Sequence, residues 1–159
     1  MDFHEKTIKS EEIFKGRVLN LNLDTVNLPN GKTSTREVVN HPGAVCVAVL
    51  TSNREIVLVK QYRHALSKTI LELPEGKLEN GEIPLCAAKR ELTEETGIIG
   101  KDFKSLGHTY VSPGYSSEII YLYACKIETV KNLNLDEDEF LEPVYVNFDS
   151  AVKMVQNDE

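Results

Sequence analysis

One segment of the chain has the apolar spacing of a helix and lies between two groups of short strand-like segments. This order constrains the fold more than any other feature. Leu85, Ala88 and Leu92 recur at helical intervals, Pro84 fits the first helical turn, and Gly97 fits the position just past the C-terminus. Strands with interspersed helices and hairpin-length links predict an α/β or α+β sandwich with a mixed sheet, rather than a doubly wound parallel fold.

The strand-like segments divide at clear turn signals. Apolar and polar residues alternate along 14–28, stop at the Pro-Asn-Gly sequence 29–31 and resume along 32–41, which predicts an N-terminal antiparallel β-hairpin. Residues 43–50 and 54–62 are predicted to form a second strand pair, buried on both faces. Further predicted strands cover 69–74, 104–111, 118–127 and 142–148. A last helix is predicted over 149–156, with Asp149 or Ser150 as its N-cap.

Composition excludes several classes of protein. The 159 residues suit one domain covering 1–159, and the 25 acidic against 18 basic residues give a formal net charge of −7. We therefore expect no general affinity for nucleic acid or for anionic membranes. The three cysteines have no metal-binding spacing and sit in apolar surroundings, so we predict buried free thiols and a cytoplasmic protein.

The predicted central helix carries charge where a helix tolerates it poorly. Glu91, Glu94 and Glu95 crowd its last two turns, near the negative end of the helix dipole. One like-charged pair at this spacing costs about 0.2–0.5 kcal/mol, and Arg90 offsets only part of the repulsion. An acidic run is usually a solvated helix face. The alternative is a site for a hard divalent cation such as Mg²⁺, which takes carboxylate oxygens and substrate phosphates as ligands.

The surrounding spacing favours the metal site. Gly76 is followed after five residues by Glu82 and, after seven more, by the sequence Arg-Glu-Leu-Thr-Glu-Glu-Thr-Gly-Ile at 90–98. This segment resembles the signature of the Nudix hydrolases at every defined position. The resemblance implies an αβα sandwich with a mixed β-sheet, and metal-dependent hydrolysis of a nucleoside diphosphate linked to another group, with Mg²⁺ or Mn²⁺ as cofactor.

The same resemblance implies roles for the signature residues. Arg90 would hold the carboxylates in place, and Glu82 would orient the loop or a water molecule. The implied metal ligands are Glu91, Glu95, Glu94 and the backbone carbonyl of Glu75. Glu94 and Arg90 are also counted as catalytic residues. Since only the carbonyl of residue 75 coordinates, we expect Glu75 to be tolerated where relatives usually have alanine.

Residues outside the signature resemble the ADP-ribose pyrophosphatase subgroup. Pro113 stands fifteen residues beyond Ile98, and the sequence Gln-Tyr-Arg at 61–63 resembles a segment in which Arg63 would contact a phosphate. Phe14 and Arg36 fall where that subgroup stacks the adenine between two subunits of a homodimer, with residues 1–42 involved in dimerisation. Alternatively, Arg63 is a surface residue at a strand end and Phe14 belongs to the core.

The general base is left open between three acidic residues. In the subgroup a glutamate from an acidic loop swings over the metals; Glu137 is the first candidate here and Glu139 the second. Glu118 is the third, and it could instead bind a metal or the terminal ribose. A solvated turn is the alternative for the acidic run 136–139.

The leading functional prediction is hydrolysis of the pyrophosphate bond of ADP-ribose to AMP and ribose 5-phosphate. An alternative is a Nudix enzyme that acts on another nucleotide sugar, a dinucleoside polyphosphate or a nucleoside triphosphate. A third is a non-catalytic module that senses nucleotides, although such modules commonly lose signature glutamates. Because the glutamates repel one another, removing Glu95 is also expected to leave the metal-free protein as stable as before, or slightly more stable.

Overall fold

The structure is a computed structural model that describes residues 2–133, 135 and 140–157. The chain divides into two compact units. The first comprises Met1–Gly43 with Thr109–Ile120, and the second comprises Ala44–His108 with Tyr121–Glu159. The two units are described separately below.

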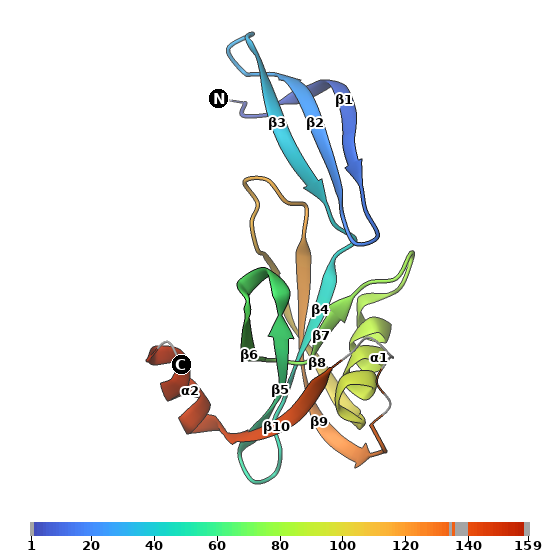
Figure 1. Ribbon diagram of the computed structural model, residues 1–159, viewed down its shortest axis with the longest axis vertical. Helices are drawn as coiled ribbons and strands as arrows, with labels where there is room; N and C mark the ends of the chain where they lie inside the picture. The colour runs from blue at the N-terminus through green and yellow to red at the C-terminus, as the bar shows by residue number, and fades with distance from the viewer. Residues whose placement is uncertain (1, 134, 136–139, 158–159) are drawn as a thin grey trace. The chain divides into compact units, whose positions relative to one another are not determined.

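The first unit is built on an antiparallel sheet of three strands, in the order β1-β2-β3 (Figure 1). These strands are β1 (Lys6–Lys15), β2 (Asn20–Asn27) and β3 (Thr33–Asn40). The predicted hairpin corresponds to β2 and β3, and Gly31 takes a positive φ of 81° in the turn between them. The outer strand β1 was not part of the predicted hairpin, because all ten of its residues are exposed and show no buried face.

The second unit has two sheets, a 3-10 turn and two helices. One sheet has the order β10-β5-β6 and the other has the order β7-β4-β9-β8. Strands β8 and β9 continue into the first unit. The elements are β4 (Ala44–Val49), β5 (Glu55–Arg63), η1 (His64–Leu66), β6 (Lys68–Glu72), β7 (Glu75–Lys77), α1 (Pro84–Thr96), β8 (Ile98–Tyr110), β9 (Ile119–Val130), β10 (Leu141–Asn147) and α2 (Phe148–Gln156).

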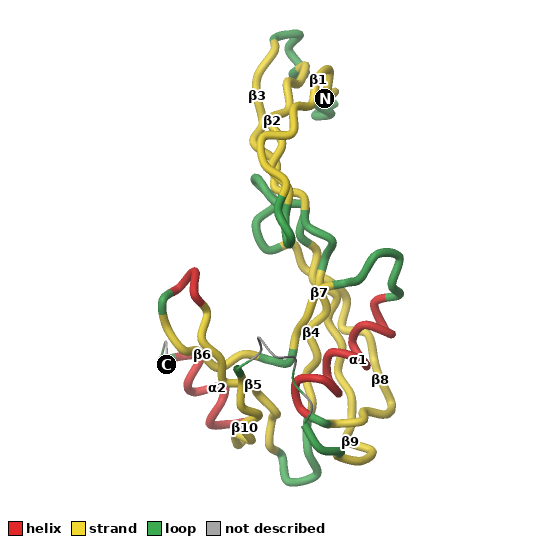
Figure 2. The backbone as a smooth tube through the Cα atoms, turned by 45° about the vertical axis from the view of Figure 1, so that its right-hand side comes forward, coloured by secondary structure: helices red, strands yellow, loops and turns green. Residues whose placement is uncertain are grey.

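The two helices of this unit lie on opposite sides of the two sheets in Figure 1. Helix α1 packs against β4 and β7, as Figure 2 also shows, and α2 packs against β10 and β5. This arrangement confirms the predicted α+β sandwich. The buried core joins β4 and β5 to the inner face of α1 and consists of Val45, Val47, Val49, Val57, Ala87, Ala88, Leu92, Ile98 and Cys125.

The ends of α1 follow the sequence signals closely. Pro84 occupies the first helical turn, where its missing N–H has no intrahelical partner to lose. Gly97 ends the helix in the left-handed region, with φ of 72° and its N–H donating to the carbonyl of Thr93. The helix therefore begins and ends at the residues that the sequence indicates, and this fixes the positions of its glutamates along the helix.

Three expectations are corrected. Strands β4 and β5 were expected to pair, but they lie in different sheets and share only an isolated bridge between Leu50 and Ile56. The N-cap of α2 is Asn147, rather than Asp149 or Ser150 as predicted. The Asn147 side chain accepts hydrogen bonds from the backbone N–H groups of Asp149 and Ser150. Cys86 is exposed on α1, whereas Cys125 is buried as expected.

Candidate active site

Arg90 is the centre of a hydrogen-bond network between α1 and the loop before it. Its Nε and Nη2 atoms donate to the two carboxylate oxygens of Glu82, at 3.1 and 2.9 Å. Its Nη1 atom donates to Glu91 at 2.8 Å and to Glu94 at 2.9 Å, and Nη2 also reaches the carbonyl of Lys77 at 3.2 Å. One guanidinium thus holds three carboxylates and the end of β7 together.

The charges in this network favour one another. Hydrogen bonding to Glu82 is the main cause that raises the pKa of Arg90 above its ordinary value, although burial opposes it. The same hydrogen bond is the main cause that lowers the pKa of Glu82, and the backbone N–H of Glu79 adds to it. Arg90 therefore supplies the counter-charge that the acidic end of α1 needs.

Glu95 lies apart from this network and is buried. Only 5% of the residue is exposed, and its Oε2 atom accepts a hydrogen bond of 2.9 Å from the backbone N–H of Glu75. Gly76, next along β7, has no room for a side chain, because an added Cβ would lie 1.9 Å from the carboxyl carbon of Glu91. The absence of a side chain at Gly76 therefore lets the Glu91 carboxylate lie directly against the backbone of β7.

The donor chemistry of this region suits a hard divalent cation. Glu91, Glu94 and Glu95 offer carboxylate oxygens from one end of α1, and β7 brings backbone groups beside them. Within the described residues, no group of three or more His, Cys, Asp or Glu side chains is arranged to hold a metal ion. Instead, Glu91 and Glu94 point at Arg90 while Glu95 binds the backbone of β7, so coordination requires these side chains to turn toward one another.

Arg63, predicted to contact a phosphate, is held by two carboxylates. Its Nε atom donates to Glu72 at 2.6 Å, and its Nη2 atom donates to Glu75. Burial alone lowers the pKa of Arg63, but the hydrogen bond to Glu72 and the negative charge of Glu75 outweigh it and raise the pKa. Arg63 therefore lies beside the backbone that binds Glu95, in the same unit as the signature helix.

The first unit contains the predicted adenine-binding residues. Phe14 on β1 is 56% exposed, so within this chain it is not a core residue. Arg36 on β3 donates to both carboxylate oxygens of Glu5, through Nε at 2.9 Å and Nη2 at 2.6 Å. Strand β2 separates β1 from β3, and in the register of the sheet Phe14 is opposite Leu21 whereas Arg36 is opposite Asp24.

Pro113 lies in an exposed turn that is fastened to the end of β3. The N–H of Val39 donates to the carbonyl of Tyr115 at 2.7 Å, and Val39 and Ser116 form a parallel bridge. Glu118, just after this turn, lies 3.6 Å from the Nδ1 atom of His41. The structure therefore places Pro113 and Glu118 near the C-terminal end of β3, in the first unit.

Sequence reasoning missed the carboxylate partners of both arginines. Glu72 binds Arg63 and Glu5 binds Arg36, but neither glutamate belongs to a recognisable motif. The only local signal was an acidic residue close to a strand end. The two first candidates for the general base, Glu137 and Glu139, lie outside the described residues.

Comparison with known proteins identifies the class that this fold and site define. The NUDIX domain family model matches residues 39–159, and the model for the nucleoside diphosphate sugar hydrolase N-terminal domain matches residues 5–39. The chain belongs to the Nudix hydrolase family. The predicted family is thereby confirmed.

Three individual relatives show which members of the family this chain is similar to. The chain is 46% identical over 157 residues to the ADP-ribose pyrophosphatase of Bacillus subtilis (strain 168), covering 98% of this chain and 85% of the relative. It is 49% identical over 156 residues to the methanol dehydrogenase activator of Bacillus methanolicus, covering 97% and 84%. The ADP-ribose pyrophosphatase of Mycobacterium tuberculosis is 40% identical over 119 residues, which cover 74% of this chain and 58% of the relative.

No helix in the described part of the chain is both long enough and apolar enough to cross a membrane.

Proposed function

We propose that this Nudix enzyme hydrolyses the pyrophosphate bond of ADP-ribose to AMP and ribose 5-phosphate, with Mg²⁺ or Mn²⁺ as cofactor. The observation that carries the proposal is the Arg90 network, in which one guanidinium binds Glu82, Glu91 and Glu94 on the helix that also carries the buried Glu95. The sequence identity of 46% to an ADP-ribose pyrophosphatase, over nearly the whole chain, supports ADP-ribose as the substrate.

In the proposed site, Glu91, Glu94 and Glu95 supply carboxylate oxygens to the cation, and the backbone carbonyl of Glu75 completes the set. When bound, the divalent cation neutralises the diphosphate oxygens and polarises the attacking water. Arg90 acts as a positioning residue, because its hydrogen bonds fix the side chains of Glu91 and Glu94. The protein thus contributes orientation, together with carboxylates whose negative charge a single guanidinium offsets only in part.

Substrate recognition is assigned to residues outside the signature. Arg63 binds a phosphate of the substrate, while Phe14 and Arg36 stack the adenine, since a planar guanidinium packs well on a purine. The Pro113 turn selects the ADP-ribose class, and Glu118 binds the terminal ribose or acts as the base. Glu137 or Glu139, which lie outside the described residues, is the alternative general base.

Product analysis tests this function. The purified protein is incubated with Mg²⁺ and a panel of ADP-ribose, other nucleotide sugars, dinucleoside polyphosphates and nucleoside triphosphates. AMP and ribose 5-phosphate should accumulate fastest from ADP-ribose, and EDTA should stop the reaction. Preference for another member of the panel would replace ADP-ribose as the substrate and keep the Nudix chemistry. No turnover of any member would favour a nucleotide-sensing module.

A second candidate function rests on the relative from Bacillus methanolicus, whose printed name is methanol dehydrogenase activator. The chain could act on a dehydrogenase in a similar way. Adding the protein to the methanol dehydrogenase of that organism should raise its rate if this candidate is correct. A Glu95→Gln variant then separates the two functions, because activation that survives loss of hydrolysis does not depend on the Nudix site.

We also propose a homodimer formed through residues 1–42, with the whole chain 1–159 acting as one catalytic domain. The support is the family resemblance together with the apolar side chains that β1 exposes, Ile8, Ile13 and Phe14. An exposed strand at the edge of a sheet is a ready surface for a second chain.

A further inference from the structure

The carboxylate of Glu75 lies where the substrate phosphate is proposed to bind. Its oxygen accepts a hydrogen bond from Nη2 of Arg63, while its backbone N–H donates to Glu95 at 2.9 Å. One residue thus contacts the proposed phosphate-binding arginine through its side chain and a proposed metal ligand through its main chain.

The charges around Arg63 oppose the binding of an anion. A single positive charge faces two carboxylates, Glu72 and Glu75, so the group is negative as a whole. The two carboxylates occupy Nε and Nη2, which form one of the edges through which a guanidinium makes a bidentate contact with a phosphate. A phosphate can use that edge only if one carboxylate leaves.

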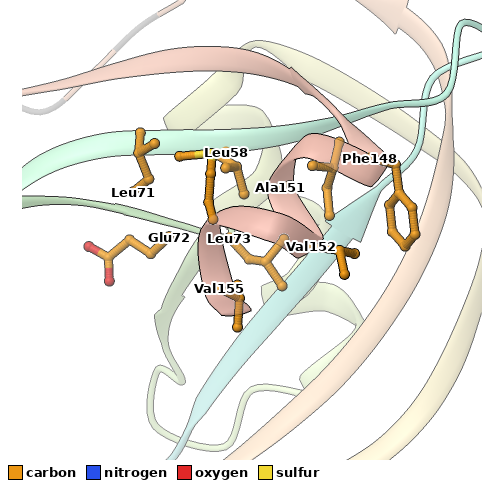
Figure 3. A pocket seen from close by; sticks show the side chains of 10 residues that line it. Leu58, Leu71, Glu72, Leu73, Phe148, Ala151, Val152 and Val155 are labelled. Atoms are coloured by element: carbon orange, nitrogen blue, oxygen red, sulfur yellow. The ribbon is translucent and has the colours of Figure 1, made fainter. Parts of the chain in front are cut away.

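Of the two carboxylates, that of Glu75 is the more exposed. Its side chain is 30% exposed, against 19% for Glu72. Glu72 also lines an apolar pocket of about 290 Å³ between β5, β6 and α2, together with Leu71 and Leu73. Figure 3 shows its carboxylate directed away from the apolar side chains of that pocket. Glu75 is therefore the carboxylate that a ligand from solvent reaches more readily, whereas Glu72 lies beside the apolar pocket.

We propose that the Glu75 carboxylate is an internal competitor for the substrate diphosphate at Arg63: it holds the guanidinium in the ligand-free enzyme and is displaced when substrate binds. This inference rests on the proposed role of Arg63 in the function given above. Its consequence is that Glu75 weakens the binding of ADP-ribose, and that removal of its charge strengthens binding.

Calorimetric titration with ADP-ribose in EDTA tests this directly, because no hydrolysis is expected without a divalent cation. Glu75→Gln removes the charge and keeps the backbone N–H that binds Glu95. The dissociation constant should fall by about three- to tenfold, the range expected for release of a partly exposed charge-assisted contact. Glu75→Ala serves as a second variant should Glu75→Gln fold poorly, and it is expected to shift binding in the same direction.

Two controls separate this effect from a general change of charge. Glu79→Gln removes an equal charge from an exposed position in the loop that follows β7 and should leave the dissociation constant unchanged. In an Arg63→Gln background, Glu75→Gln should have no effect, since the competition needs the guanidinium. A purely structural role of Glu75 would produce the same change with and without Arg63.

The outcomes distinguish this inference from the proposed function. If Glu75→Gln leaves ADP-ribose binding unchanged or weakens it, the competition does not occur, although Arg63 still binds phosphate if Arg63→Gln alone weakens binding. If Arg63→Gln has no effect on binding, Arg63 is not a phosphate ligand and the inference fails with it. Failure of the wild-type protein to release AMP from ADP-ribose would instead reject the proposed function.

Discussion

The environment of the Glu95 side chain changes a prediction of stability that was based on charge alone. Repulsion among three glutamates near a helix C-terminus suggests that removing one of them relieves strain. In the structure, however, Glu95 is buried and accepts a hydrogen bond from the N–H of Glu75. A buried N–H that loses its acceptor costs about 1–3 kcal/mol, which exceeds the repulsion that is removed. The expectation of unchanged stability therefore holds only for a substitution that keeps an acceptor.

Two substitutions at Glu95 should consequently differ. Glu95→Gln keeps an oxygen that can accept from the N–H of Glu75 and should change the unfolding free energy of the metal-free protein by less than about 0.5 kcal/mol. Glu95→Ala should lower it by about 1–3 kcal/mol. Both should reduce kcat by about 100-fold or more. Urea unfolding in EDTA and AMP release in Mg²⁺ measure the two effects, with Glu128→Ala at an exposed position as the control. Equal stability of the two variants would contradict the role given to this hydrogen bond.

At the level of the element, α1 is fixed to its neighbours at both ends. The loop before the helix is held by Glu82, which binds both Arg90 and the N–H of Glu79. The helix stops at Gly97, whose carbonyl accepts from the N–H of Lys131. Signature residues thus position the helix as well as its carboxylates, so variants at these positions should lose stability along with activity.

The loop contact should depend on pH in a defined direction. Since the pKa of Glu82 is lowered from 4.5 in the folded protein, its contribution to stability is present above pH 4.5 and is lost as the pH falls through the folded-state pKa. Glu82→Gln should therefore lower the unfolding free energy by about 1 kcal/mol at pH 7.5, and by progressively less below pH 4.5. Urea unfolding at pH 7.5, 5.5 and 4.0 measures this. A cost that stays constant over this range, or that Glu79→Gln reproduces, would show that the charge of Glu82 is not responsible.

Two glycines that flank α1, one before its start and one at its end, form a matched pair. Gly81 and Gly97 have nearly the same positive φ, 76° and 72°. An added Cβ meets nothing within 4 Å at Gly81, but at Gly97 it would lie 2.4 Å from the carbonyl oxygen of Lys131. Gly81→Ala should therefore cost only the strain of a left-handed alanine, about 1–2 kcal/mol, and Gly97→Ala should cost about 3 kcal/mol or more. Thermal unfolding compares them; equal costs would mean that the backbone of Lys131 moves aside easily.

Across the whole molecule, local sequence signals predicted the helices and strands, whereas long-range contacts determine which strands lie in the same sheet. Pro84 and Gly97 delimit α1 because their backbone preferences act within one turn. The division of β4 and β5 between two sheets was missed, because a short turn between apolar strands gives no information about which strands lie beside them.

The candidate site divides in the same way. The spacing within 76–98 is local, so the sequence alone predicted that the carboxylates and their arginine share one helix. The partners of Arg63 and Arg36 lie 9 to 31 residues away in sequence, and only the fold brings Glu72, Glu75 and Glu5 to them. A guanidinium at a strand end can bind either a phosphate or a carboxylate, and the sequence alone contains no feature that distinguishes these two partners.

The first unit is proposed to act in the formation of a homodimer. Strand β1 exposes Ile8, Ile13 and Phe14 by half or more. If residues 1–42 form the dimer, the wild-type protein should have twice the 17.9 kDa mass of one chain in light scattering. Ile13→Asp places a charge in that surface and should yield monomers, whereas Val130→Asp, an equally exposed position on β9, should not. A wild-type monomer, or an Ile13→Asp dimer, would contradict the proposal.

Activity of the same variant tests whether the two subunits share a site. Phe14 and Arg36 are proposed to contact the adenine from different chains, while the carboxylates of α1 belong to one chain. Loss of the dimer should therefore remove adenine binding and raise the KM for ADP-ribose by about tenfold or more, with a smaller change in kcat. The reverse result, a lower kcat at unchanged KM, would mean that dimerisation supports the catalytic carboxylates and that adenine is bound within a single chain.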